Sequence, residues 1–255
     1  MKEFFLEIKN AVSDFSFYKV VKDFDVSRSV KYIFSLILLI TFILTVRFSI
    51  DFRRGVNVAA DWALVNLPPI QITNGVASVE AKQPYIIEEE DFGLVIDTTG
   101  EVTGLDAYER GVLLMKDRLV YKESDVKTET YNLADIDSLV IDEKFINSIR
   151  KNAVWILFPI MLIGAMISAA IAKFFQIFAF SLISISASTM VKVKLTYKQL
   201  FNIGVFAITP SYILGGLLTL IGLRLPLFGI VYSGLYIAYL ILAVKTCREA
   251  PETPA

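Results

Sequence analysis

Hydrophobic residues are concentrated in two parts of the chain, and a long stretch of mixed polarity separates them. Val30–Val46 is nearly all apolar, and apolar residues predominate again from Ala153 to Val244. A run of about 20 apolar residues is long enough to cross a lipid bilayer as a helix. Residues 51–152 instead alternate polar and apolar positions, as a water-soluble domain does. The pattern predicts a polytopic α-helical membrane bundle with a small α+β domain inserted after the first span.

The first apolar stretch is predicted to be a transmembrane anchor over residues 30–50. Arg47–Asp51 offers no small-x-small cleavage site, which favours an uncleaved anchor over a signal peptide. The second stretch can be divided in two ways, because Ala153–Met190 is too long for one straight span. It is either one long helix with a cytoplasmic extension or two spans broken near Lys173. Two further spans are expected, from about Gln199 to Ile221 and from Leu227 to Val244.

The distribution of lysine and arginine favours four spans over five. With four spans both termini are cytoplasmic, and the cytoplasmic side carries more basic residues than the other side. With five spans this bias reverses. In either case residues 51–152 are expected to be extracytoplasmic. The predicted order is a cytoplasmic segment 1–29, the anchor 30–50, the outer domain 51–152, the bundle 153–245 and a cytoplasmic tail 246–255.

The first 29 residues repeat an amphipathic helical pattern. Their apolar positions are Phe4, Phe5, Ile8, Val12 and Phe15, beside several lysines. Such a helix either lies on the anionic inner leaflet of the membrane or packs against the transmembrane bundle. The sequence leaves both interpretations open.

The middle domain has the pattern of a meandering sheet flanked by helices. Asn74-Gly75 and Lys116-Asp117 are predicted to be hairpin turns. The expected strands are Ile70–Thr73, Val76–Ala81, Tyr85–Glu88, Gly93–Asp97, Val112–Met115 and Arg118–Lys122. A short helix is expected at Asp61–Leu67, before two prolines. Residues Asn132 to Asn152 are expected to be helical and to run into the next span, with Ile136, Leu139, Val140, Ile146 and Ile149 on one face.

The composition excludes several kinds of chemistry. The chain has no histidine and a single cysteine, Cys247, so histidine-dependent catalytic triads, thiolate metal sites and internal disulfides are excluded. The net charge of -1 gives no general attraction to nucleic acid. We therefore expect no cofactor, no metal and no nucleic-acid partner.

The segment Asp97-Thr98-Thr99-Gly100 follows an apolar strand and resembles the Asp-Thr-Gly motif of aspartic proteases. Those enzymes use two aspartates that share a proton, and here an extra threonine intervenes with no second copy in the chain. We expect a tight turn in which Asp97 and the threonine hydroxyls bond backbone amides and Gly100 takes a positive φ. Asp97, Thr98, Thr99 and Gly100 are also the candidate surface for a ligand or partner.

The membrane segments contain polar and small residues that indicate packing or a kink. Thr209 and Pro210 interrupt a predicted span, and Pro210 deprives the carbonyl of Phe206 of its helical partner. Gly164 and Ser168 have the small-xxx-small spacing of closely packed membrane helices. Such features also occur along transporter substrate paths, but no acidic residue or histidine lies in any predicted span. Packing is the favoured interpretation.

Several phrases in the chain resemble a bacterial membrane family, domain of unknown function 1189. They are Phe15–Lys19, Lys31–Phe34, Asn74-Gly75, Ile96–Gly100 and Gly111–Asp117. The segments Leu195–Phe201 and Ala207–Pro210 are similar to the wider Yip superfamily, in which this basic loop is cytoplasmic. The resemblance implies an anchor, an outer domain and a C-terminal bundle, and it implies a membrane adaptor more than an enzyme.

The expected function is therefore a non-enzymatic protein of the bacterial cytoplasmic membrane. Its outer domain would bind a partner or ligand, and its bundle would associate with other integral membrane proteins, such as a transporter or a second copy of the chain. The alternative is a transport or lipid-handling protein that uses the Pro210-kinked bundle. A membrane hydrolase centred on Asp97 ranks third.

Overall fold

The computed structural model describes residues 2–223 and 225–248, and the chain divides into two compact units. The bundle unit comprises Met1–Ile50 and Ile156–Ala255, and the sheet unit comprises Asp51–Trp155. Within the described residues, four helices are long and apolar enough to cross a membrane: Val26–Asn66, Glu143–Ser186, Tyr197–Leu220 and Phe228–Thr246. A bundle of apolar helices and a separate sheet-bearing unit inserted between them are therefore present, as the hydropathy pattern predicts.

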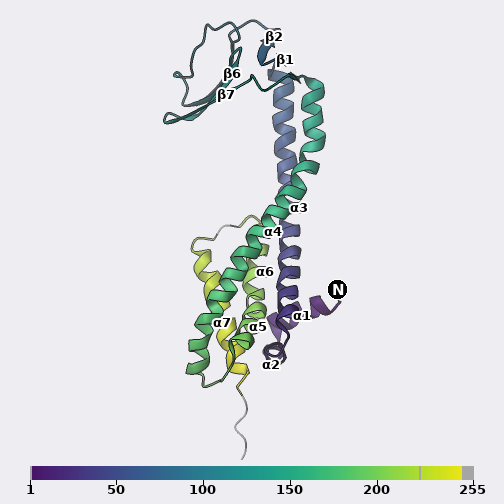
Figure 1. Ribbon diagram of the computed structural model, residues 1–255, viewed down its shortest axis with the longest axis vertical. Coiled ribbons are helices and arrows are strands. Elements are labelled where there is room, and N and C mark those ends of the chain that lie inside the picture. Colours follow the sequence, from purple (N-terminus) through teal and green to yellow (C-terminus); the bar gives the residue numbers. More distant parts are fainter. Residues whose placement is uncertain (1, 224, 249–255) are drawn as a thin grey trace, which may run out of the picture. The chain divides into compact units, whose positions relative to one another are not determined.

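The bundle unit begins with three short helices, α1 (Lys2–Ser13), η1 (Phe15–Phe17) and α2 (Tyr18–Val21), shown in purple in Figure 1. Its core is formed by large side chains from α2, α3, α5 and α7, among them Tyr18, Ile33, Leu36, Ile203, Phe206 and Tyr236. Phe4 and Ile8 of α1 pack against this core, and Ala11 is fully buried in it. The N-terminal segment thus packs on the bundle, which is one of its two predicted arrangements.

The two longest helices both extend beyond the predicted membrane segments. α3 (Val26–Asn66) has 41 residues and α4 (Glu143–Met190) has 48. At 1.5 Å per residue each is roughly twice as long as the ~30 Å hydrocarbon core of a bilayer. The separate helix predicted at Asp61–Leu67 is wrong, because no proline interrupts α3 before Pro68. α4 is unbroken at Lys173, which agrees with the four-span division and not with the five-span one.

The C-terminal part of the bundle unit contains α5 (Tyr197–Ala207), α6 (Thr209–Leu220) and α7 (Phe228–Thr246). α5 begins with a capping box, in which Thr196 and Gln199 bond each other's backbone N–H groups. α5 and α6 form one predicted span, interrupted at Ile208. α7 corresponds to the last predicted span.

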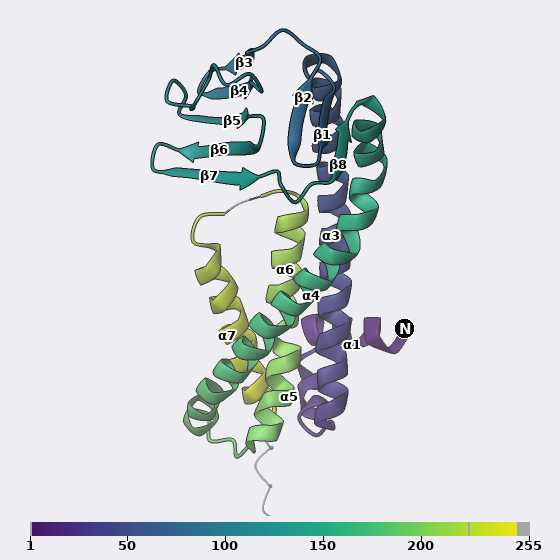
Figure 2. The ribbon, with the colours of Figure 1, turned by 45° about the horizontal axis from the view of Figure 1, so that its top comes forward.

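The sheet unit contains two sheets (Figure 2). The larger has the strand order β3-β4-β5-β6-β7 and the smaller has the order β2-β1-β8. The strands are β1 (Ile70–Thr73), β2 (Val76–Val79), β3 (Tyr85–Glu89), β4 (Phe92–Ile96), β5 (Arg110–Leu114), β6 (Arg118–Ser124), β7 (Lys127–Asn132) and β8 (Ser138–Ile141). Asn74 and Gly75 both have positive φ, as a two-residue type I′ hairpin turn requires.

Three features of the sheet unit differ from the prediction. β7 was not predicted, and its mostly polar residues, KTETYN, give a weak strand signal. The helix predicted from Asn132 begins only at Glu143, because Ser138–Ile141 pairs with β1 instead. Leu139 and Ile141 alternate with exposed neighbours in β8. The helix was predicted because Ile136, Leu139, Val140, Ile146 and Ile149 have the spacing of one helix face. Finally, β4 and β5 are parallel, so the sheet is not a simple meander.

Candidate functional site

The turn that follows β4 is built around the carboxylate of Asp97. Oδ1 of Asp97 accepts hydrogen bonds from the Thr99 hydroxyl (2.6 Å), the Thr99 amide (2.9 Å) and the Gly100 amide (3.3 Å). Oδ2 accepts one from the Val102 amide at 2.5 Å. Asp97 is fully buried, and Gly100 has φ +91°. The predicted tight turn is therefore present, and both carboxylate oxygens are engaged in it.

These hydrogen bonds determine the charge state of Asp97. Burial raises the pKa of this carboxyl, but the hydrogen bonds from Thr99, Val102 and Gly100 lower it by more, so the pKa lies below its usual value. Thr98 contacts a different group, since its amide and hydroxyl both donate to Oε1 of Gln83, at 2.6 and 3.0 Å. The arrangement suits an ionised carboxylate that holds a loop together.

The acidic stretch from Glu88 to Asp91 also forms a turn. Glu88 accepts a hydrogen bond from the Tyr108 hydroxyl at 2.5 Å, and Glu89 accepts one from the indole N–H of Trp62 at 3.0 Å. Glu90 has φ +43° where β3 turns into β4. Across the described parts of the chain, no group of three or more acidic or cysteine side chains is placed to hold a metal ion.

A groove of about 590 Å³ crosses the face of β6 and β7 and is bordered by the loop between β4 and β5. It is lined by apolar, hydroxyl and charged side chains, including Leu105, Asp106, Arg118, Val120, Lys122 and Thr130. The Lys122 ammonium is fixed there by the Tyr108 carbonyl at 2.6 Å and by Asp125 at 2.9 Å. Mixed apolar and polar lining is typical of ligand and peptide sites. The groove could not be predicted from the sequence, because Thr128 and Thr130 in its lining belong to β7, which was not predicted.

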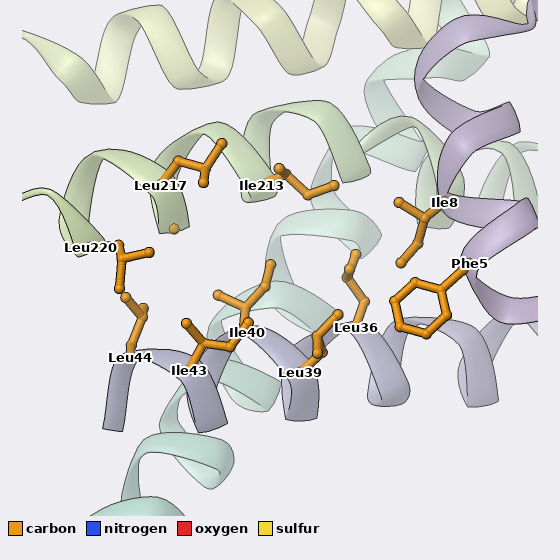
Figure 3. A pocket seen from close by; sticks show the side chains of 11 residues that line it. Phe5, Ile8, Leu36, Leu39, Ile40, Ile43, Leu44, Ile213, Leu217 and Leu220 are labelled. Atoms are coloured by element: carbon orange, nitrogen blue, oxygen red, sulfur yellow. The ribbon is translucent and has the colours of Figure 1, made fainter. Parts of the chain in front are cut away.

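A second, wholly different pocket lies in the bundle unit between α1, α3 and α6 (Figure 3). Its volume is about 220 Å³ and its lining is apolar throughout. Leu36, Ile40 and Leu44 of α3 face Ile213, Leu217 and Leu220 of α6, and Phe5 and Ile8 of α1 close one end. Gly216 leaves the space open, since a Cβ there would lie 3.1 Å from Ile40.

Thr209 and Pro210 lie at the junction between α5 and α6. α5 ends at Ala207 and α6 begins at Thr209, so the helix is interrupted where Pro210 cannot donate to the Phe206 carbonyl. The Thr209 hydroxyl is 2.8 Å from the Tyr32 hydroxyl of α3, and both side chains are buried. The predicted interruption of the helix is present, and at this point the Thr209 hydroxyl forms a hydrogen bond with α3.

Gly164 and Ser168 lie on an exposed part of α4. A Cβ added to Gly164 would meet no described atom within 4 Å. Within the described chain no other helix lies against Gly164, so a packing role for this pair stays a prediction that concerns other membrane proteins. The close approach instead occurs at Gly204, where a Cβ would lie 2.9 Å from Oγ of Ser181 and 3.3 Å from the Tyr236 hydroxyl.

Lys173 of α4 is held by aromatic and amide groups. Its ammonium is 2.8 Å from the Tyr232 hydroxyl and 3.4 Å from Oε1 of Gln176. It also lies over the rings of Tyr212 and Tyr232, 4.7 and 4.5 Å from their centroids. These contacts join α4 to α6 and α7 by hydrogen bonding and cation–π attraction.

Four helices of membrane-spanning length and composition, combined with a separate sheet-bearing unit, define this chain as a membrane protein. The family model described as protein of unknown function (DUF1189) matches residues 5–244. The chain therefore belongs to this family, as the sequence phrases indicate. No curated protein and no solved structure matches the chain. The similarity to the Yip superfamily stays a prediction.

Proposed function

We propose that this chain is a non-enzymatic protein of the bacterial cytoplasmic membrane whose sheet unit recognises a partner or ligand outside the cytoplasm. The observation that carries the proposal is the groove over β6 and β7. Its charged groups are held by neighbouring groups, such as Lys122 by Asp125, and its apolar groups, such as Leu105 and Val120, lie beside them. This combination favours selective binding of a polar chain or small molecule.

The bundle's role in the proposal is association with other membrane proteins. None of the residues in the most apolar window of α4 is buried within the chain. Trp155, Ile171 and Phe175 are among the exposed large side chains of α4. Lipid covers such a face in a single protein, and a transporter or a second copy of the chain covers it in a complex.

A photo-crosslinking experiment in cells tests the recognition role. A benzoylphenylalanine placed at Thr130, which is exposed in the groove, should give an adduct that mass spectrometry identifies. The matched control is the same probe at Ser78, which is exposed on β2 of the other sheet. Identical adducts from both positions, or none from Thr130, would refute recognition by the groove.

The orientation has its own test. Cys247 is the chain's single cysteine and is buried, so a new cysteine is a better probe than the native one. Ser78→Cys in a Cys247→Ala background should react in intact spheroplasts with a membrane-impermeant maleimide. Reaction only after the membrane is permeabilised would place the sheet unit in the cytoplasm.

The apolar pocket between α1, α3 and α6 favours a second candidate, a lipid-handling or transport role. Its lining resembles the environment of an acyl chain, and the interruption at Pro210 lies in the same α5–α6 segment. Purified protein in liposomes should then accelerate lipid scrambling or solute flux, and Gly216→Leu, which fills the pocket, should abolish it. A hydrolase centred on Asp97 is the weakest candidate, because the turn uses both carboxylate oxygens.

A further inference from the structure

At one end of the bundle unit, four cationic side chains surround a pocket of about 310 Å³. They come from three separate segments of the chain. Lys22 follows α2, Lys192 and Lys194 lie in the connection between α4 and α5, and Arg248 follows α7. The fold, not local sequence, brings these charges together.

The base of this cationic pocket is packed and well defined. Val193 and Cys247 both line it, and both are buried. The Cys247 thiol lies 3.5 Å from the Tyr18 carbonyl, which links α7 to α2 beneath the pocket. Val193 precedes Lys194 and Cys247 precedes Arg248, so these two buried side chains fix where the neighbouring cations leave the protein surface.

The connection between α4 and α5 has a constrained backbone at the same place. Lys192 has φ +55°, a left-handed conformation that few residues other than glycine adopt. The amides of Lys192 and Val193 donate to the carbonyls of Thr189 and Ser188, at 3.1 and 2.9 Å. These two hydrogen bonds close the turn and fix the backbone from which the Lys192 and Lys194 side chains project.

Among the residues that the structure describes, a carboxylate lies within 4.0 Å of only one of the four pocket cations. Asp23 lies 4.0 Å from the Lys22 ammonium, and its other oxygen accepts a hydrogen bond from Gln199 at 2.9 Å. Over residues 2–223 and 225–248, the other three cations, Lys192, Lys194 and Arg248, form no ion pair with a carboxylate. Clustered like charges repel one another, so an anion bound among them relieves that repulsion.

We propose that this pocket binds a phosphate group, carried either by a phospholipid headgroup or by a soluble phosphorylated compound. Guanidinium and ammonium groups form strong charge-assisted hydrogen bonds with phosphate oxygens. Basic pockets between membrane helices are suited to anionic headgroups. The volume is several times the ~30 Å³ that one water occupies in the liquid, so a phosphate fits. This site goes beyond the recognition role proposed for the sheet unit.

Two probes distinguish the sources of the phosphate. Native mass spectrometry of the full chain in neutral detergent measures binding of phosphatidylglycerol against phosphatidylcholine, and calorimetry measures binding of inorganic phosphate. We expect Lys192→Gln/Lys194→Gln to weaken the binding of at least one anionic probe about tenfold or more. Phosphatidylglycerol binding that inorganic phosphate does not displace assigns the site to lipid, and displacement assigns it to a soluble phosphate.

Matched variants show whether any loss is specific. Lys144→Gln/Lys151→Gln removes the same charge from exposed positions near the start of α4, and Lys192→Arg/Lys194→Arg keeps the charge in the pocket. Both should bind as the wild type does. The proposal is overturned if neither probe binds, or if the Lys144/Lys151 variant loses as much affinity as the pocket variant.

Discussion

Ser29 of α3 donates a buried hydrogen bond of 2.8 Å to Oδ1 of Asn202 in α5. The amide nitrogen of Asn202 also donates to the backbone carbonyls of Lys22 and Phe24, at 3.2 and 2.7 Å. Both side chains are fully buried. Asn202 therefore fixes the short segment between α2 and α3 against α5, in a core that is otherwise mainly apolar.

Replacing Asn202 by leucine should destabilise the bundle unit. The change leaves the Ser29 hydroxyl and two backbone carbonyls without these partners, and a buried polar group left unsatisfied costs about 1–3 kcal/mol. Ser29→Ala removes only one of the three bonds and should cost less. Thermal unfolding in detergent, followed by circular dichroism, measures both, and an Asn202→Leu variant that melts with the wild type would contradict the role assigned to this side chain.

The sheet unit should lose stability in acid because of Asp97. Its pKa is lowered in the folded chain, below the value of about 3.9 for an unperturbed aspartate. The stabilisation is therefore fully present above that value and is lost as the pH falls through the lowered folded pKa. Both tryptophans, Trp62 and Trp155, belong to the sheet unit, so their fluorescence during urea unfolding measures this stability.

Asp97→Asn is the comparison for this pH dependence. The amide cannot accept the hydrogen bond from Val102 with its nitrogen, and a hydrogen bond to a charged group is worth about 1.5–3 kcal/mol. The variant should be less stable near neutral pH and should lose less stability on acidification from about pH 6 to about pH 3. Equal acid sensitivity in both proteins would assign the effect to other carboxylates.

Much of the fold follows from the hydropathy pattern, because the local signals agree with the tertiary structure. Six predicted strands and the Asn74-Gly75 turn are present, and the interruption before Pro210 occurs where a proline removes a donor. The errors arose where pairing between strands distant in the sequence determines the secondary structure. Ile136, Leu139 and Val140 have the spacing of a helix face, but Ser138–Ile141 becomes a strand because it pairs with the edge of β1.

The candidate sites were less predictable than the fold. The Asp97 turn could be predicted because all its partners lie within five residues in the sequence. The groove on the sheet unit requires β7, and the cationic pocket requires Lys22 and Arg248 to meet after more than two hundred intervening residues. No local pattern encodes such a meeting.

Gly111→Ala should disrupt the larger sheet. Gly111 pairs with Gly93 across the parallel strands β4 and β5, and a Cβ at Gly111 would lie 2.4 Å from the Gly93 carbonyl oxygen. Because that oxygen is backbone, the two strands must separate, and overpacking of this kind costs about 1–3 kcal/mol. Gly104→Ala is the control, since its nearest neighbour would lie 3.5 Å away. Urea unfolding followed by tryptophan fluorescence should show a lower midpoint for Gly111→Ala only.

Valine substitutions at Gly204 and Gly164 should separate packing within the chain from contact with other proteins. At Gly204 the added atoms meet Ser181 and Tyr236, so α5 must move away from α4 and α7, at a cost of about 1–3 kcal/mol. A Cβ added at Gly164 would meet no described atom within 4 Å, so the melting temperature of Gly164→Val in detergent should stay close to that of the wild type.

The second measurement on these variants is copurification of membrane partners after mild crosslinking. If the Gly164 face of α4 contacts another membrane protein, Gly164→Val should reduce that copurification without lowering the melting temperature, because bulk at the face keeps the two helices apart. Gly204→Val should do the reverse: it should lower the melting temperature, while membrane partners still copurify with the folded protein. A Gly164→Val variant that keeps both its stability and its partners would show that lipid alone covers this face.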